Sequence, residues 1–362
     1  MHATRVRKEL APGTRIRVLV VDGSLVVRQR LAQALEGDPS IEVVGVAANG
    51  AHALERIAQW NPDVLTLDLE GPGMDSLETL RQVRHRYPEI RVILLGTGMQ
   101  QGSQAAFEAL ARGVDDYVMK TPEYDDAGDG ATRLQAELVP KIKQFFKSAP
   151  QPARAEAPAG IGEIYVPPVK SRCQLLVIGV STGGPAALAK VLPRFAPDFP
   201  LPVLVVQHMP AQFTRLLAER LAGSCPLRVR EATEGALVQP GRVLLAPGDF
   251  HMRVRKVNNQ ATIHLDQSPP ENSCRPSVDV LFRSAGEVYG GSVMAVVLTG
   301  MGHDGLRGAS TLKALGATVL VQDEASSVVW GMPGAVATAG LADAVVPLDC
   351  MVPEIVRRIQ RS

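Results

Sequence analysis

Short apolar runs alternate with helical stretches along the whole chain, and this alternation limits the fold more than any other feature. In the first half, five apolar runs are each followed by a segment with helical periodicity. The expected strands cover residues 16–21, 41–47, 64–67, 91–95 and 116–119, and the expected helices cover residues 25–35, 51–59, 76–85, 103–111 and 131–146. This alternation predicts a parallel sheet with helices on both faces.

The second half repeats the pattern. Strands are expected over residues 175–180, 202–206, 293–298 and 318–321, with short strands and turns between residues 227 and 264. Helices are expected over residues 211–222, 277–288 and 353–360, with two more that end near residues 195 and 315. The predicted fold class is therefore α/β in both halves.

A segment rich in Ala and Pro separates the two halves. It covers residues 148–170 and contains few large apolar side chains, which is typical of an extended, semi-rigid linker. The predicted domains are therefore residues 15–147 and residues 171–362. A chain of 362 residues, 46% of them hydrophobic, is long enough to build two cores of this kind.

The charge balance and the cysteines argue against several classes of protein. The net charge is +1, from 38 basic and 37 acidic residues, so we expect no nucleic-acid partner. The four cysteines are scattered without a C-x-x-C pair, which favours a reducing cytoplasmic location over a disulfide framework or a zinc site. We expect no membrane insertion, because no apolar run approaches the roughly 20 residues that span a bilayer.

Three charged residues of the first half each follow an apolar run directly. Asp22, Asp68 and Lys120 should therefore lie together at the carboxyl edge of the sheet, where sites form in open α/β folds. Two carboxylates at such an edge can hold Mg²⁺, and a neighbouring lysine can pair with a phosphoryl oxygen. The alternative, three unrelated loop charges, is less favoured because all three occupy equivalent places.

Ser181 lies in a strand-to-helix turn. It follows the apolar run 175–180 directly, and two glycines and Pro185 come next. Gly179 to Gly183 also fits the G-x-S-x-G pattern of a nucleophilic serine. Taken alone, the pattern is equally typical of a phosphate-binding turn or a structural turn.

A nucleophilic serine needs a base within hydrogen-bonding distance and a carboxylate that orients this base. His208 follows the second apolar run of this half, and Asp304 lies in the loop after the third. The ends of parallel strands meet at one sheet edge, so Ser181, His208 and Asp304 form the favoured catalytic set.

The other histidines of this half leave one alternative open. His264 lies within an alternating strand and is expected at the surface, whereas His251 and His303 could approach the site. In α/β-hydrolases the acid precedes the histidine, so such a triad would use Ser181, Asp249 and His303. We consider this alternative the weaker one.

The first half resembles a response-regulator receiver domain, a flavodoxin-like fold of five βα units. The matching sequences are VVD at 20–22, PDVLTLD at 62–68 and DYVMKTP at 116–122. The resemblance implies Asp68 as phosphoacceptor, Asp22 and Asp68 as Mg²⁺ ligands and Lys120 as the phosphate-sensing lysine. Gly23 replaces a usual second carboxylate, and Gly96 replaces a usual Ser or Thr, with Thr97 one residue late. We therefore expect weak Mg²⁺ binding and slow phosphorylation.

The second half resembles the chemotaxis protein-glutamate methylesterase family, CheB. The matching sequences are IGVSTGGP at 178–185, QHMP at 207–210, APG at 246–248, RPSVDVLF at 275–282, TGMGHDG at 299–305 and EASSVVWGMP at 324–333. The resemblance implies a doubly wound, mostly parallel α/β esterase domain. Ser181 would be the nucleophile, His208 the base and Asp304 the orienting acid. Thr182 and Met301 are candidates for the oxyanion hole, and no cofactor is expected for the esterase step.

The two resemblances together imply a chemotaxis response regulator, controlled by phosphorylation of its receiver, that hydrolyses glutamyl methyl esters by acyl transfer. The same chemistry could also deamidate glutamine side chains. Its expected partners are methyl-accepting chemoreceptors as substrates and a histidine kinase as phosphodonor. The alternatives are a non-catalytic receiver-linked adaptor and a serine hydrolase that acts on another carboxyl ester. A receiver with a DNA-binding output is disfavoured, because the second half is large and nearly neutral.

Overall fold

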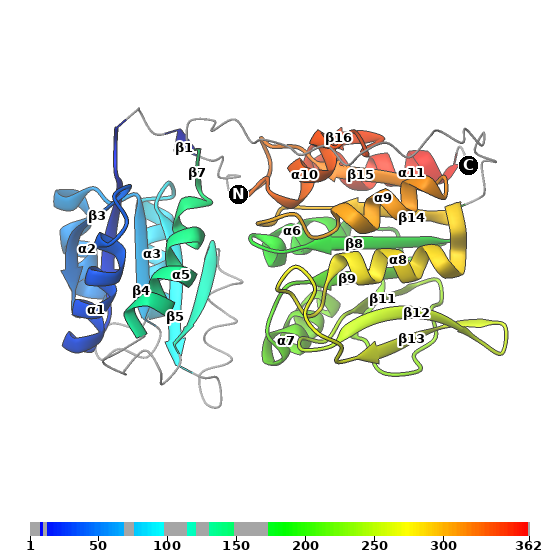
Figure 1. Cartoon of the computed structure of the whole chain (residues 1–362), viewed down its shortest axis with the longest axis horizontal. Helices are drawn as coiled ribbons and strands as arrows, with labels where there is room; N and C mark the ends of the chain where they lie inside the picture. Colours follow the sequence, from blue (N-terminus) through cyan, green and yellow to red (C-terminus); the bar gives the residue numbers. More distant parts are fainter. Residues whose placement is uncertain are drawn as a thin grey trace.

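Two α/β domains lie side by side in the computed structural model (Figure 1). The structure describes residues 8–9, 13–68, 76–97, 114–120, 130–147 and 173–360. The expected helix over residues 103–111 and the expected linker over residues 148–170 lie outside these described residues.

The first domain is built on a five-stranded parallel sheet with the order β3-β2-β4-β5-β6. Its strands are β2 Ile16–Val21, β3 Ile41–Ala47, β4 Val64–Asp68, β5 Arg91–Thr97 and β6 Asp116–Lys120. The central strand β4 is buried along its whole length, as expected for a parallel strand that is covered on both faces. The predicted parallel sheet is confirmed.

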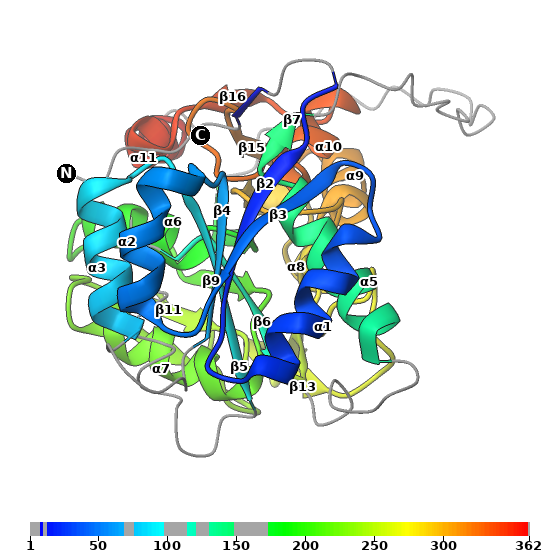
Figure 2. The same cartoon turned by 90° about the vertical axis from the view of Figure 1, so that its left-hand side faces the viewer.

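Helices cover both faces of this sheet. They are α1 Leu25–Glu36, α2 Gly50–Trp60, α3 Ser76–Arg86 and α5 Gly130–Lys143. Figure 2 shows α1 and α5 on one face and α2 and α3 on the other. The predicted cap is present, since Ser24 Oγ accepts a hydrogen bond from Val27 N at the start of α1.

The end of this domain differs from the prediction. The helix expected to reach residue 146 ends at Lys143, and Phe146–Lys147 forms a short strand, β7. This strand pairs in parallel with β1, Lys8–Glu9, which lies before the predicted domain start at residue 15. Phe146 is buried, so its apolar character, which resembled helical periodicity, reflects the core that it enters.

The second domain is built on a seven-stranded sheet with the order β10-β11-β9-β8-β14-β15-β16, in which every pairing is parallel. Its strands are β8 Leu175–Val180, β9 Val203–Gln207, β10 Arg228–Glu231, β11 Arg242–Leu245, β14 Val293–Val297, β15 Thr318–Gln322 and β16 Ala344–Val346. The sheet is doubly wound, as predicted. The three-residue strand β16 was not predicted.

Alternate residues of β8 enter two different cores. Leu176 and Ile178 pack with the helices on one face, α6 Gly184–Val191, α7 Ala211–Ala222 and α11 Met351–Gln360. Leu175 and Val177 pack with those on the other face, α8 Val278–Tyr289, α9 Leu306–Ala314 and α10 Met332–Thr338. An antiparallel hairpin, β12 His251–Val257 and β13 Gln260–Asp266, packs against α8. Helix α10 was not predicted.

No helix among the described residues combines the length and the apolar character that a membrane span requires. All four cysteines are free thiols.

Candidate active site

Ser181 and His208 follow the neighbouring strands β8 and β9, which brings their backbones together. The Gln207 side-chain amide donates hydrogen bonds to the carbonyl oxygens of both residues, at 3.0 Å for Ser181 and 3.1 Å for His208. Both residues line one cavity of about 1030 Å³. The predicted convergence at the carboxyl edge of the sheet is therefore observed for the serine and the histidine.

The turn at Ser181 depends on its glycines. Gly183 has a φ of 77°, a left-handed conformation that glycine adopts without strain. A Cβ on Gly184 would lie 1.9 Å from Oε1 of Gln207, so a larger residue would push away the side chain that holds the turn. Pro185 then lies in the first turn of α6, a position that suits its fixed φ. These contacts explain why the serine stands at the end of the strand, outside the helix.

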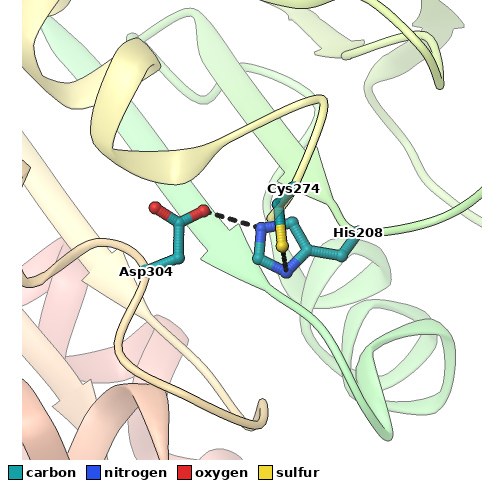
Figure 3. Close-up of side chains that lie close together, drawn as sticks. All are labelled: His208, Cys274 and Asp304. Carbon is teal, nitrogen blue, oxygen red and sulfur yellow. Dashed lines mark hydrogen bonds and ion pairs between the residues drawn. The ribbon is translucent and has the colours of Figure 1, made fainter. Parts of the chain in front are cut away.

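His208, which is partly exposed, and Asp304, which is buried, form a close pair. Nε2 of His208 lies 2.8 Å from Oδ2 of Asp304 (Figure 3). A carboxylate only accepts hydrogen bonds, so Nε2 carries the proton, and Nδ1 has the free lone pair in the neutral ring. Nδ1 is therefore the atom that can take a proton from a hydroxyl group. Among the described residues, no hydrogen bond joins Ser181 Oγ to His208.

Several donors besides His208 hold Asp304 in place. Its carboxylate accepts from backbone N–H groups, a hydroxyl and an amide, with distances between 2.7 and 3.1 Å; the donors are Val278 N, Asp279 N, Gly305 N, Ser277 Oγ and Asn272 Nδ2. Burial alone would raise the pKa of Asp304, but the bonds from His208 and these N–H groups lower it well below its usual range. Asp304 is thus a fixed negative charge next to Nε2 of the imidazole ring.

This negative charge acts on His208 in turn. Burial lowers the pKa of the ring, but the hydrogen bonds and electrostatic interactions that it makes with Asp304 and Cys274 outweigh this effect and raise the pKa to about 10. The ring must lose its second proton before Nδ1 can act as a base. We therefore expect the basic form of His208 to become more abundant as the pH rises.

Cys274 contacts His208 from the side opposite Asp304, and the sequence analysis did not single it out. Its Sγ lies 3.6 Å from Nδ1 (Figure 3). The preceding residues Asn272 and Ser273 have φ values of 52° and 61°, and this left-handed pair turns the loop towards the ring. No signal in the sequence relates residue 274 to residue 208, because the contact depends on this loop conformation.

The other histidines lie apart from this pair. His251 is buried, and its Nδ1 accepts from Ser277 N at 3.2 Å, so it supports the loop that holds Asp304. His264 contacts Glu234 at 3.2 Å, and His303 is exposed. The alternative acid Asp249 is 56% exposed and pairs with Arg275. The structure thus favours Asp304 over Asp249 as the partner of a histidine.

The charged residues predicted in the first domain also come together. Lys120 Nζ lies 2.5 Å from Oδ2 of Asp22 and 2.7 Å from Oδ1 of Asp68. The other oxygen of Asp22 accepts from Ser24 N at 2.8 Å. Burial raises the pKa of Asp22 more than Lys120 lowers it. Gly96 lies in β5 as expected, whereas the side chain of Thr97 lies outside what the structure describes.

The first domain contacts the residue that follows Ser181. Thr182 Oγ1 lies 3.2 Å from Oδ2 of Asp116 and 3.3 Å from Oε1 of Gln144. The rings of Tyr117 and Phe213 pack with their centroids 5.6 Å apart. Residues of β6 and α5 also line the cavity at Ser181, so the first domain forms one wall of this cavity.

Comparison with known proteins gives matches to both domains. A family model described as CheB methylesterase matches residues 176–355, and one described as response regulator receiver domain matches residues 18–127. A protein-glutamate methylesterase/protein-glutamine glutaminase of Nocardioides sp. is 46% identical over 96% of each chain. One of Trichodesmium erythraeum is 42% identical over 95% of this chain and 99% of its own. The crystal structure of the Thermotoga maritima CheB methylesterase catalytic domain is 43% identical, with a TM-score of 0.50, and covers 52% of this chain and 99% of its own.

Proposed function

Because the chain belongs to the CheB methylesterase family, in which a receiver domain is joined to an esterase domain, we propose that Ser181, His208 and Asp304 are its catalytic triad. The substrates are glutamyl methyl esters on methyl-accepting chemoreceptors. One observation carries this proposal. Nε2 of His208 lies 2.8 Å from Oδ2 of Asp304, and His208 lines the same cavity as Ser181.

The proposed reaction follows from the geometry of the ring. Ser181 Oγ attacks the γ-carbonyl carbon of the ester while Nδ1 of His208 takes the hydroxyl proton. Asp304 stabilises the imidazolium that forms, because its charge lies at Nε2. Nδ1 then gives the proton to the departing methoxide, and methanol leaves. A water molecule hydrolyses the acyl-serine by the same steps in reverse.

Two backbone N–H groups are the proposed oxyanion donors. Within the described parts of the chain, neither Thr182 N nor Met301 N donates a hydrogen bond, and both residues line the cavity. A free N–H group at this place can bind the charge that develops on the carbonyl oxygen. Each such donor contributes roughly 3–4 kcal/mol to transition-state stabilisation.

The same acyl transfer would also deamidate glutamine, since only the leaving group changes from methanol to ammonia. The relatives from Nocardioides and Trichodesmium carry both activities in their names. The leaving nitrogen needs a proton, and the protonated Nδ1 of His208 can supply it.

The receiver domain is proposed to regulate the esterase through phosphorylation of Asp68 by a histidine kinase. Asp22 and Asp68 offer carboxylate oxygens, which are the ligands that Mg²⁺ prefers, so the chemistry of these side chains fits this ion. When bound, Mg²⁺ would neutralise charge on the transferring phosphoryl group. Lys120 now contacts both carboxylates and would pair with a phosphoryl oxygen on Asp68 instead. This exchange of partners would shift the end of β6 that carries Lys120. The opposite end of β6 carries Asp116, which contacts Thr182.

The test is methanol release from methylated receptor membranes by the full chain. Ser181→Ala should abolish release, by a factor of about 10⁶ for loss of a triad nucleophile. Ser224→Ala is the matched control, because Ser224 is exposed and its hydroxyl donates a hydrogen bond to the neighbouring carbonyl oxygen of Leu221. Activity of Ser181→Ala within a few fold of the control would contradict the triad, whereas a wild-type chain that releases no methanol would favour the non-catalytic adaptor.

A further inference from the structure

Cys274 is a nucleophilic residue in the cavity that the proposed ester hydrolysis does not use. Its Sγ lies 3.6 Å from Nδ1 of His208, and the opposite ring nitrogen lies 2.8 Å from Asp304. In Figure 3 the two dashed lines leave the ring from different nitrogens, one towards each partner. Cys274, His208 and Asp304 thus have the arrangement in which a base activates a thiol and a carboxylate orients the base.

The other cysteines have different surroundings. Cys173 and Cys225 contact backbone carbonyl oxygens, of Leu175 and Leu192 respectively. Burial raises the pKa of both thiols, to about 11 for Cys173. Cys350 is exposed. Of the four thiols, Cys274 is the one that combines contact with an imidazole ring and a position on the cavity wall.

We propose that Cys274 is a modification site for small oxidants and electrophiles, and that its oxidation switches the esterase off. This inference rests on the function proposed above, because it is the contact with His208 that makes a modified thiol inhibitory. The cavity of about 1030 Å³ is large enough to admit a peroxide or a maleimide.

The reaction with hydrogen peroxide balances without a further reactant. In the neutral form of the ring, Nδ1 takes the thiol proton, and Sγ attacks one peroxide oxygen, so that an S–O bond forms while the O–O bond breaks. The second oxygen leaves with the proton from Nδ1 as water. Sulfur loses two electrons, the peroxide gains them, and Cys274 becomes a sulfenic acid. Two molecules of a thiol reductant return Cys274 to the thiol and form a disulfide and water.

The sulfenic acid inhibits through its position. Its added oxygen lies on the side of the ring where Ser181 Oγ must approach Nδ1. Its O–H group is also a stronger hydrogen-bond donor than the thiol, so it occupies the lone pair that the serine proton needs. Inhibition therefore requires no change in Ser181, Asp304 or the fold.

The first experiment measures the thiol without using esterase activity. The full chain is treated with N-ethylmaleimide at neutral pH, and the labelling rate of each cysteine is followed by mass spectrometry. His208→Gln should slow the labelling of Cys274 by about tenfold and leave that of Cys350 unchanged. Cys173 and Cys225 report on folding, since unfolding would raise their rates to that of Cys350. Equal Cys274 rates in folded His208→Gln and wild type would overturn the proposal.

The second experiment measures the consequence for the enzyme. Hydrogen peroxide should inactivate wild type, and dithiothreitol should restore it. Cys274→Ser should resist inactivation relative to its own starting activity, whereas Cys350→Ser should be as sensitive as wild type. Equal inactivation rates for Cys274→Ser and wild type would overturn the proposal. An active His208→Gln variant would instead contradict the triad, so the two failures are distinguishable.

Discussion

The receiver and the esterase domain each place buried carboxylates at the carboxyl edge of a parallel sheet, but they stabilise them in opposite ways. In the receiver, one cation, Lys120, contacts both Asp22 and Asp68. In the esterase, Asp304 is held mainly by neutral N–H and O–H donors and by His208. The pKa of Asp22 is raised, because burial outweighs Lys120, whereas donors outweigh burial and lower the pKa of Asp304.

This difference separates a switch from a fixed site. The donors around Asp304 are fixed by the backbone of the loop before α8, the start of α8 and Gly305 before α9, so we expect them to keep their places when substrate binds. The Lys120 side chain, in contrast, can exchange one oxygen partner for another. An organised donor set suits a transition state that must be stabilised immediately, while a movable cation suits a group whose charge changes on phosphorylation.

Among the variants that test this comparison, Asp304→Asn should have the largest effect. An amide cannot accept the backbone donors as a carboxylate does, and it disturbs the tautomer of His208. We expect kcat to fall by about 10⁴, measured as methanol release. Asp249→Asn is the matched control and should change activity little, because Asp249 pairs with Arg275 at the surface. The opposite ranking would favour the triad of Ser181, Asp249 and His303.

The second effect concerns pH. Because the pKa of His208 is raised from 6.5 to about 10, the ring is protonated near neutrality and becomes a base as the pH rises. Esterase activity should therefore increase with pH by up to about tenfold per unit below that pKa. Cys274→Ala should move the profile towards lower pH, because Cys274 helps to raise the pKa. A profile already flat above pH 7 would show that Asp304 does not hold the ring in its charged form.

The third effect should be found in the receiver. Gly23→Asp adds a carboxylate to Asp22 and Asp68, and we expect about tenfold tighter Mg²⁺ binding and faster labelling with acetyl phosphate. Gly13→Asp is a control, because Gly13 is exposed and a Cβ there meets nothing within 4 Å, although its φ of 82° adds some strain. If Gly23→Asp and wild type agree in both measurements, the expected weakness of this metal site is wrong.

The smallest effect concerns the contact between the domains. A fragment that begins near residue 171 lacks the side chains of Asp116 and Gln144 that contact Thr182. We expect it to release methanol a few fold faster than the unphosphorylated full chain. Adding the isolated receiver should reverse part of this gain. A folded fragment with equal or lower activity would show that the receiver does not slow the esterase by covering its cavity.

The sequence predicted the strands well because parallel strands buried on both faces are short apolar runs with polar ends. For the same reason it placed Ser181, His208 and Asp304 at one sheet edge. It did not predict Cys274 or the role of His251, since their contacts depend on loop conformations that leave no periodic signal. The predicted end of α5 was wrong because Phe146 continues the apolar spacing of the helix, although it belongs to a strand that pairs with Lys8–Glu9.

Strand β6 connects the two candidate sites directly. Lys120 ends this strand beside Asp68, the proposed phosphoacceptor, and Asp116 begins it at Thr182, one residue from the proposed nucleophile Ser181. Four steps along an extended strand cover about 13 Å. Over this span the backbone is a single stiff segment, hydrogen-bonded to β5. In the proposed regulation, a change of partner at Lys120 can therefore be transmitted to Thr182 along one strand.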